Sequence, residues 1–122
     1  MQSEAHRFLP LSPAALHILL SLAGEDLHGY GIMQEVARQS QGKYKLGPGT
    51  LYDNLQKLIH REWVEELGRR PGDEDPRRRY YRLTLSGRGV LEAEISRLAE
   101  VVREGRSRLQ LTRSAAAKPR RA

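Results

Sequence analysis

The chain has 122 residues, which is enough for one domain with short tails, and 30% of them are charged. It contains no cysteine, which excludes disulfides, thiolate chemistry and cysteine-based metal sites and is compatible with the cytoplasmic location that we expect. The longest apolar run, residues 14–23, reaches only about half the length of a membrane span, and the N-terminus lacks the basic start of a signal peptide. We therefore expect no contact with a membrane.

The formal net charge of +6 is unevenly distributed along the chain. Residues 112–122 hold four basic residues and no acid, which leaves 17 basic and 15 acidic residues in the remainder. Within that remainder, basic residues gather over residues 43–61 and on both sides of an acidic run at 73–75. Local positive clusters are suited to contacts with phosphates, and the alternative is an ordinary solvated surface.

The N-terminal half begins with an expected arm and two short helices. Residues 1–10 are predicted to form a flexible or loosely docked arm. Ser12 followed by Pro13 is typical of a helix start, and apolar spacing predicts a first helix over residues 13–23 and a second over residues 29–39. Together with a third amphipathic helix, they would form a helix-turn-helix.

The third helix carries the most informative pattern in the chain. Leu51, Leu55 and Leu58 follow the i, i+4, i+7 spacing of a buried stripe. Pro48 suits a first turn, and Gly49 lets the backbone approach a phosphate at the positive end of the helix dipole. Most side chains on the remaining surface can form hydrogen bonds with bases or phosphates: Thr50, Tyr52, Asp53, Asn54, Gln56 and Lys57. This pattern predicts a recognition helix, and a plain amphipathic surface helix is the alternative.

Two segments rich in β-formers follow, at residues 63–67 and 79–83, and a turn-rich loop at 68–76 joins them. They predict a β-hairpin wing whose tip is mobile and whose arginines reach phosphates or a minor groove.

Alternation along the hairpin predicts which of its side chains are buried. Tyr81 and Leu83 share one face and are expected in the core, whereas Tyr80 and Arg82 point the other way. Trp63, the only tryptophan, is expected in the core, and stacking on an effector is the alternative.

A long C-terminal helix is expected from Leu85 to about residue 109, with Thr84 as its cap. Its apolar residues step by 4, 3, 4 and 7 as in a heptad seam: Leu91, Ile95, Leu98, Val102 and Leu109. A partner subunit would cover this seam, whereas Val90 and Val101 are expected to pack on their own domain. Gly105 lies at a seam position and should weaken the seam beyond it.

The expected organisation is mainly α with a small β-hairpin wing. A winged helix-turn-helix DNA-binding domain over residues 11–84 precedes a dimerisation helix over 85–111. A basic disordered tail over 112–122 ends the chain, because it has little apolar bulk and contains a proline.

Three motifs, in this order and at this spacing, resemble the PadR family of bacterial transcriptional regulators over roughly residues 11–109. They are His28-Gly29-Tyr30-Gly31-Ile32, Gly49-Thr50-Leu51-Tyr52, and Arg77-Arg78-Arg79-Tyr80-Tyr81-Arg82-Leu83-Thr84-Leu85-Ser86-Gly87. The resemblance implies a winged helix-turn-helix repressor that dimerises through its C-terminal helix and releases operator DNA when an effector binds.

Two positions depart from the family pattern. Asp53 stands where such proteins often have proline, and its carboxylate is suited either to a cytosine amino group or to capping the helix. Glu62 stands where the family favours glycine at the end of the recognition helix, although a left-handed helix end suits glycine better.

The residue pattern and the resemblance together assign three sets of residues. The predicted DNA-binding residues are Lys45, Gly49, Thr50, Tyr52, Asn54, Lys57, Arg69, Arg70, Arg77, Arg78 and Arg79. The predicted dimerisation residues are Leu91, Ile95, Leu98, Val102 and Leu109. By the resemblance, a small aromatic or hydrophobic effector would lie between the dimer helices and the DNA-binding domains, next to Leu16, Trp63, Leu91 and Ile95, although these same residues would also suit a dry core.

Catalytic and metal chemistry find little support in the sequence. The four histidines are scattered without metal-ligand spacing, the serines have no adjacent base, and the glycines near Thr50 lack the ending of a phosphate-binding loop. We expect no enzyme, metal or cofactor. Two rivals to the repressor remain: a winged-helix protein-interaction module without specific DNA binding, and a nucleoid-like or RNA-binding protein acting through its basic tail.

Overall fold

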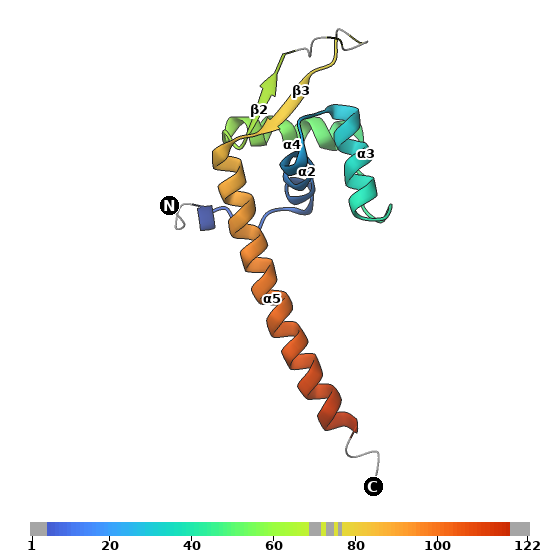
Figure 1. Ribbon diagram of the computed structural model, residues 1–122, viewed down its shortest axis with the longest axis vertical. Coiled ribbons are helices and arrows are strands. Elements are labelled where there is room, and N and C mark those ends of the chain that lie inside the picture. Colours follow the sequence, from blue (N-terminus) through green and yellow to red (C-terminus); the bar gives the residue numbers. More distant parts are fainter. Residues whose placement is uncertain (1–4, 69–71, 73–74, 76, 118–122) are drawn as a thin grey trace.

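A computed structural model of the chain describes residues 5–68, 72, 75 and 77–117. Three helices form the head of the molecule: α2 (Pro13–Gly24), α3 (Gly29–Gln39) and α4 (Pro48–His60). A fourth, α5 (Leu85–Ala117), starts at the head and runs far beyond it (Figure 1). Among the described helices, none combines the length and the apolar character that crossing a membrane requires.

The helices start as local chemistry predicts. The Ser12 hydroxyl accepts a hydrogen bond from the Ala15 backbone N–H at 3.1 Å, so Ser12 is the N-cap of α2. Thr84 lies between the end of β3 and the start of α5. Its hydroxyl accepts a hydrogen bond from the Gly87 N–H at 3.0 Å and donates one to the Glu62 carbonyl at 2.6 Å. Thr84 therefore caps α5 and ties it to the end of α4.

The core of the head forms where the apolar stripes of the three helices pack together. Its fully buried side chains include Ile18 and Leu19 of α2, Ile32 of α3, and Leu51 and Leu55 of α4. Burying a side chain of this size contributes about 1.5–3 kcal/mol, so the predicted stripe of α4 holds this helix against α2 and α3. The opposite side of α4 is left at the surface.

A three-stranded antiparallel sheet completes the head, in the order β1-β3-β2. The wing consists of β2 (Val64–Leu67) and β3 (Tyr80–Leu83), paired from Val64 with Leu83 to Leu67 with Tyr80. The third strand, β1 (Leu27–His28), pairs with β3 and was not predicted, because two residues are too few for any alternation to appear. The fold class predicted from sequence is confirmed: mainly helical, with a small sheet and a long C-terminal helix.

Strand β1 also corrects the prediction for Tyr80. Tyr81 and Leu83 are buried as expected, with 5% and 7% of their surface exposed, but Tyr80 is buried too, at 9%. The His28 ring lies against the Tyr80 ring, with 5.4 Å between their centroids. The unpredicted strand therefore covers a tyrosine that a two-stranded hairpin would leave exposed.

The turn from α4 into the wing has the geometry that usually selects glycine. Glu62 has a φ of 64°, its N–H donates to the Ile59 carbonyl at 2.9 Å, and the Trp63 N–H donates to the Leu58 carbonyl at 3.0 Å. This is the paired helix end known as a Schellman motif. The left-handed conformation destabilises a residue with a side chain by about 1 kcal/mol, and Glu62 adopts it nevertheless.

The N-terminal segment is docked from residue 5 onward, which is firmer than the arm we predicted. The Phe8 ring meets the Trp63 ring edge to face at 5.1 Å, and Leu9 packs partly buried against the core. The Leu11 N–H donates to the Glu94 carboxylate at 3.0 Å. Three separate contacts thus fasten this segment across the head and α5.

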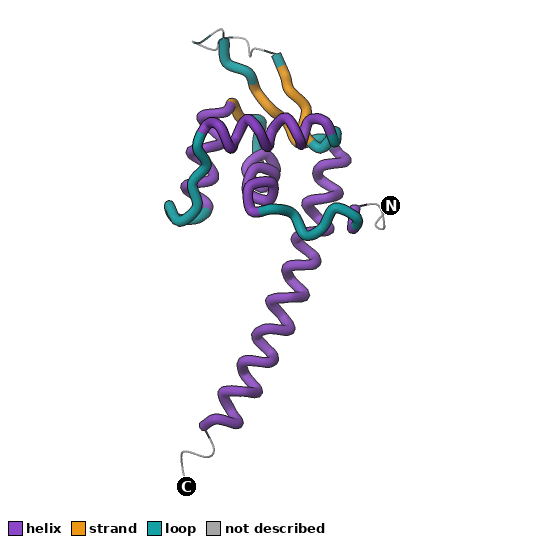
Figure 2. Tube along the Cα trace, turned by 180° about the vertical axis from the view of Figure 1, so that it is seen from behind, coloured by secondary structure: helices purple, strands orange, loops and turns teal. Residues whose placement is uncertain are grey.

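Helix α5 is longer than predicted and divides into two parts. Its first three turns bury Val90, Leu91 and Glu94, and its C-terminal part extends away from the head (Figure 2). Val101, expected to pack on its own domain, is 55% exposed, because the head does not reach that far along the helix. The helical backbone continues to Ala117, where three alanines favour helix, and residues 118–122 of the predicted tail lie outside the described residues.

Candidate nucleic-acid interface

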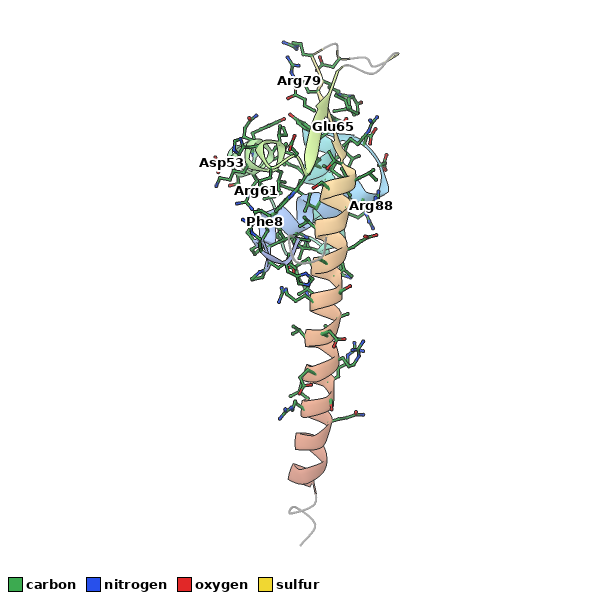
Figure 3. All side chains as sticks on the ribbon, turned by 90° about the vertical axis from the view of Figure 1, so that its left-hand side faces the viewer. Phe8, Asp53, Arg61, Glu65, Arg79 and Arg88 are labelled. Atoms are coloured by element: carbon green, nitrogen blue, oxygen red, sulfur yellow. The ribbon has the colours of Figure 1, made fainter. Side chains whose placement is uncertain are left out.

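The candidate interface is centred on the surface of α4 that faces away from the core. Figure 2 shows this helix lying across one side of the head, below the wing strands. In Figure 3 the Asp53 side chain projects outward from α4, while Arg79 lies higher up, on the wing. The helix and the wing therefore present side chains in two neighbouring regions of the surface.

The predicted base-reading side chains on α4 differ in how available they are. Thr50, Tyr52 and Lys57 are exposed, whereas Asn54 is half-buried, and its amide Nδ2 donates to the Thr50 carbonyl at 2.8 Å. One of the two N–H donors of the Asn54 amide is therefore used within its own helix, which leaves the other N–H and the amide oxygen for a base.

Tyr52 is held in place by a glycine of α3. A Cβ atom added at Gly29 would lie 2.2 Å from the Tyr52 hydroxyl oxygen, so only glycine leaves room for the tyrosine there. This contact connects two of the three sequence motifs and leaves the Tyr52 side chain 44% exposed. The hydroxyl group consequently lies between the start of α3 and the surface of α4.

Asp53 does not cap the helix, which removes one of its two predicted roles. The N-cap of α4 is Gly47, without a side-chain hydrogen bond, and Asp53 lies a full turn beyond the first helical residue, Pro48. Its carboxylate instead forms an ion pair with Lys57, with 3.4 Å between Oδ2 and Nζ. Both side chains remain about two-thirds exposed, at 68% and 70%.

The loop before α4 presents a positive charge beside the helix start. Leu46 is buried, with 7% exposed, and anchors the loop, while Lys45 next to it is exposed. A Cβ at Gly49 would meet nothing within 4 Å, so the space above the first turn of α4 is open to a ligand. This arrangement is suited to a phosphate at the helix N-terminus.

The arginines of the wing already have acidic neighbours. Arg79 pairs with Glu66 of β2 at 3.2 Å, and Arg77 lies 3.6 Å from Asp75, whose pKa is lowered first by a hydrogen bond from the Arg77 N–H. Exposed pairs of this kind contribute at most about 1 kcal/mol, so a phosphate can replace the acid. Arg69 and Arg70 lie outside the described residues.

A cleft of about 670 Å³ joins the three sequence motifs. Burial raises the pKa of the Tyr81 hydroxyl at its base, and the Glu66 carboxylate raises it further, so this hydroxyl keeps its proton at neutral pH. The cleft lies between the start of α3, the surface of α4 and the wing: it is lined by His28, Gly29, Tyr30, Tyr52, Gln56, Glu66, Asp75, Arg77, Arg78, Arg79 and Tyr81.

A second cleft, of about 1000 Å³, lies between the N-terminal segment, Trp63 and the first turns of α5. Of the four residues predicted for an effector pocket, Trp63 lines this cleft and the others do not: Leu16 and Leu91 pack in or against the core, and Ile95 is exposed. The Arg61 guanidinium lies 4.8 Å from the centre of the Phe8 ring and 5.2 Å from that of Trp63. The cleft wall thus combines aromatic faces with a positive charge.

The predicted dimerisation residues fall into two groups. Leu91 is in the core of its own chain, and Leu98 is half-buried. In contrast, Ile95, Val102 and Leu109 are 44%, 49% and 69% exposed on α5.

Sequence reasoning missed Glu94, which is 1% exposed. Its carboxylate accepts hydrogen bonds from Arg97, at 2.6 and 3.0 Å, and from the Leu11 N–H. The Arg97 hydrogen bonds lower the pKa of Glu94, against the effect of burial. The i, i+3 spacing of Glu94 and Arg97 was visible in the sequence, but nothing there showed that Glu94 would be buried. Among the described residues, no three histidine or carboxylate groups come together as metal ligands would.

Comparison with known proteins places most of the head within one family. The model of the transcriptional regulator PadR-like family matches residues 18–93. The transcriptional regulator Rv3488 of Mycobacterium tuberculosis is 37% identical over 89 residues, which cover 73% of this chain and 78% of that protein. An uncharacterized 37.1 kDa protein in transposon Tn4556 of Streptomyces fradiae is 36% identical over 88 residues, which are 72% of this chain but only 24% of that protein.

Solved structures share the fold at lower sequence identity. A PadR family transcription regulator from Clostridium difficile R20291 superposes with a TM-score of 0.69 at 21% identity, covering 80% of this chain and 99% of its own. Bacillus subtilis PadR, in complex with operator DNA, superposes with a TM-score of 0.59 at 23% identity over 68% of this chain and 46% of its own. Both likenesses support the winged-helix architecture.

Proposed function

Because this chain belongs to the PadR-like family of transcriptional regulators, we propose that it is a homodimeric repressor that binds a pseudo-palindromic DNA operator and releases it when a small aromatic or hydrophobic effector binds. The observation that carries the proposal is the common placement of the three motifs around one cleft, with the exposed face of α4 on one side and the wing arginines on the other. In the comparison structure of Bacillus subtilis PadR, the bound partner is operator DNA.

Each part of the surface suits a different part of the duplex. Thr50, Tyr52 and Lys57 on α4 would enter or flank the major groove, as a recognition helix does. Lys45 and Arg78 would contact phosphates, which supply affinity without reading sequence. Sequence reading would then depend on a few polar side chains of α4, and the wing would hold the register.

A dimer is supported by the apolar residues that the head leaves uncovered. Ile95, Val102 and Leu109 are exposed and recur at heptad spacing along α5, which continues well beyond the head (Figure 2). Two such helices packed together would bury these side chains. They would also place two recognition helices at a defined separation, which matches half-sites about one helical turn apart.

Release by an effector is supported by the second cleft. Its volume of about 1000 Å³ is at the upper end of the range of small-molecule sites, roughly 300–1000 Å³. It lies between the N-terminal segment, Trp63 and the first turns of α5, so a molecule bound there would contact both the head and the start of the helix that continues into the proposed dimer interface. The aromatic and positively charged wall formed by Phe8, Trp63 and Arg61 favours an aromatic molecule.

The proposal is tested by selecting duplexes from a random pool with the purified chain and measuring affinity for a selected and a scrambled duplex by fluorescence anisotropy. A dimer that neutralises about six to ten phosphates should give a slope of log affinity against log salt of roughly −5 to −9. The selected duplex should bind at least about 1000-fold more tightly than the scrambled one. Equal binding to both duplexes would contradict the repressor proposal and favour a nucleoid-like or RNA-binding protein that acts through its basic tail. Absence of binding to either duplex would favour a winged-helix module that binds another protein.

A further inference from the structure

We propose that Asp53 and Lys57 read one C·G base pair of the operator as a unit, with Asp53 accepting a hydrogen bond from the cytosine amino group and Lys57 donating to the guanine. This inference rests on the proposed DNA-binding function and names residues that determine its specificity. It explains why the surface of α4 carries the Asp53 carboxylate although its expected ligand, DNA, is a polyanion.

The first step is that Asp53 neither caps a helix nor packs in the core. It does not cap α4, because Gly47 is the N-cap. Its side chain is 68% exposed and projects from α4 away from the head in Figure 3. It lies in the N-terminal half of the helix, from which recognition helices contact base edges.

The second step is the chemistry of the carboxylate. An ionised carboxylate only accepts hydrogen bonds, so it is repelled by phosphates and by the acceptor atoms of bases. In the major groove, the donors are the amino groups of cytosine and adenine. Adenine presents its N7 acceptor beside its amino group, which would repel a carboxylate and instead suits the amide of asparagine or glutamine. Cytosine is therefore the base that Asp53 fits.

The third step is the spacing of the ion pair. The Asp53 Oδ2 and Lys57 Nζ atoms lie 3.4 Å apart, so α4 presents an acceptor and a donor side by side. A C·G pair presents the cytosine amino group next to the guanine O6, and these two atoms are hydrogen-bonded to each other at about 2.9 Å. The protein pair and the base-pair edge are thus complementary in both spacing and polarity.

The neighbouring residue is less available for the same task. The Asn54 amide donates to the Thr50 carbonyl at 2.8 Å, and the side chain is half-buried. One of the two N–H donors of this amide is thus used within the helix, whereas both side chains of the Asp53–Lys57 pair are about two-thirds exposed. The sequence placed Asn54 but not Asp53 among the predicted DNA-binding residues, and the exposed ion pair favours Asp53 as the reader.

The test is in vitro selection from random duplexes with the wild-type chain and with the variants Asp53→Asn, Lys57→Met and Glu100→Gln. Glu100 is a matched control, since it pairs with Arg103 on α5 and both side chains are as exposed as those of the Asp53–Lys57 pair, at 69% and 70%. We expect Asp53→Asn to lose the preference for C·G at one position per half-site by about 10-fold or more, without change elsewhere. Lys57→Met should lose preference at that same position, and Glu100→Gln at none.

Binding to scrambled DNA provides a second readout. Removing the Asp53 charge should strengthen binding to scrambled duplexes at low salt by several-fold, because repulsion of phosphates is relieved and Lys57 is released. If Asp53→Asn raises affinity for all duplexes but keeps every base preference, the carboxylate tunes charge only and the inference is wrong. If Lys57→Met affects a different position, the two residues do not read as a unit. A wild-type chain that selects no sequence at all contradicts the proposed function itself, and the inference falls with it.

Discussion

One heptad seam runs through both halves of α5, yet the two halves differ in how much of the helix is buried. In the first half, Val90, Leu91 and Glu94 are 4%, 6% and 1% exposed, because α2, β3 and the N-terminal segment lie against this part of the helix. In the second half, Val101 and Val102 are 55% and 49% exposed. A heptad pattern therefore shows that a helix has an apolar face, but the length of the head decides where its own chain stops covering that face.

This difference also separates two kinds of function within one helix. The first half belongs to the head: Gly87 lies against the Trp63 carbonyl, and Glu94 holds Leu11. From Val101 to Gln110, the part of the second half whose side chains are described, every residue except Gly105 is exposed. We therefore expect substitutions in the first half to change the stability of the head, and those in the second half to change association between chains.

The largest expected effect is on the proposed dimer. Val102→Asp would bury an unpaired charge between two copies of α5, which should weaken association by about 3–5 kcal/mol and give a folded monomer in sedimentation velocity. The matched control is Ser107→Asp, which places the same charge on the exposed face of the same helix away from the seam. If Val102→Asp sediments as a dimer of wild-type affinity, the second half of α5 is not the dimer interface.

The next effect concerns the junction between α5 and the wing. A Cβ at Gly87 would lie 2.1 Å from the Trp63 carbonyl oxygen, which also accepts the Thr84 N–H at 3.0 Å. Since backbone is pressed against backbone there, Gly87→Ala should lower the free energy of unfolding by about 1–3 kcal/mol.

The control for Gly87→Ala is Gly89→Ala, in the same turn of α5. A Cβ at Gly89 meets nothing within 4 Å, so this change should raise the free energy of unfolding by up to about 1 kcal/mol through helix propensity. Urea denaturation of both variants at one protein concentration measures the contrast. Equal effects of the two substitutions would show that the Gly87 contact is not tight in solution.

The smallest of the three effects compares two Glu–Arg pairs of equal spacing, one covered and one not. Glu94 pairs with Arg97 at 2.6 Å while 1% exposed, and Glu35 pairs with Arg38 at 2.5 Å with 29% of its side chain exposed. Glu94→Gln should lower the free energy of unfolding by about 1–2 kcal/mol at neutral pH, whereas Glu35→Gln should cost about 0.3–0.5 kcal/mol.

The pH dependence of this comparison has a definite sign. The Arg97 hydrogen bonds lower the pKa of Glu94 in the folded chain, so its contribution is fully present above about pH 4.3, where an unfolded glutamate titrates. It is lost as the pH falls through the lower folded pKa. The stability gap between wild type and Glu94→Gln should therefore be constant from pH 7 to 5 and close below about pH 4. A gap that widens on acidification would reverse this assignment.

Much of the fold followed from local patterns in the chain. The bounds predicted for α3, residues 29–39, agree with the structure, and the buried stripe of α4 and the two wing strands lie where alternation and spacing put them. These features depend on residues that are close in sequence. Strand β1 escaped prediction because its only signal is pairing with β3, more than fifty residues later in the chain.

The same division applies to the candidate site. Which side chains occupy the surface of α4 was set by helical spacing, so Thr50, Tyr52 and Lys57 were identified from sequence. The interactions of the α4 side chains could not be identified in the same way. The ion pair of Asp53 with Lys57 and the hydrogen bond from Asn54 to Thr50 depend on side-chain conformations. Asp53 consequently replaces Asn54 as the proposed base reader only once the structure is considered.

The sequence by itself determined the family, the order of the helices and strands, and the polar character of the α4 surface, because these depend on motifs and on short-range periodicity. Tertiary structure alone decided what covers each surface. It buries Tyr80 under His28 and Glu94 under the N-terminal segment, and it leaves Val101 exposed beyond the end of the head. Burial depends on contacts between residues distant in the chain, and a local pattern carries no information about which distant segment will supply them.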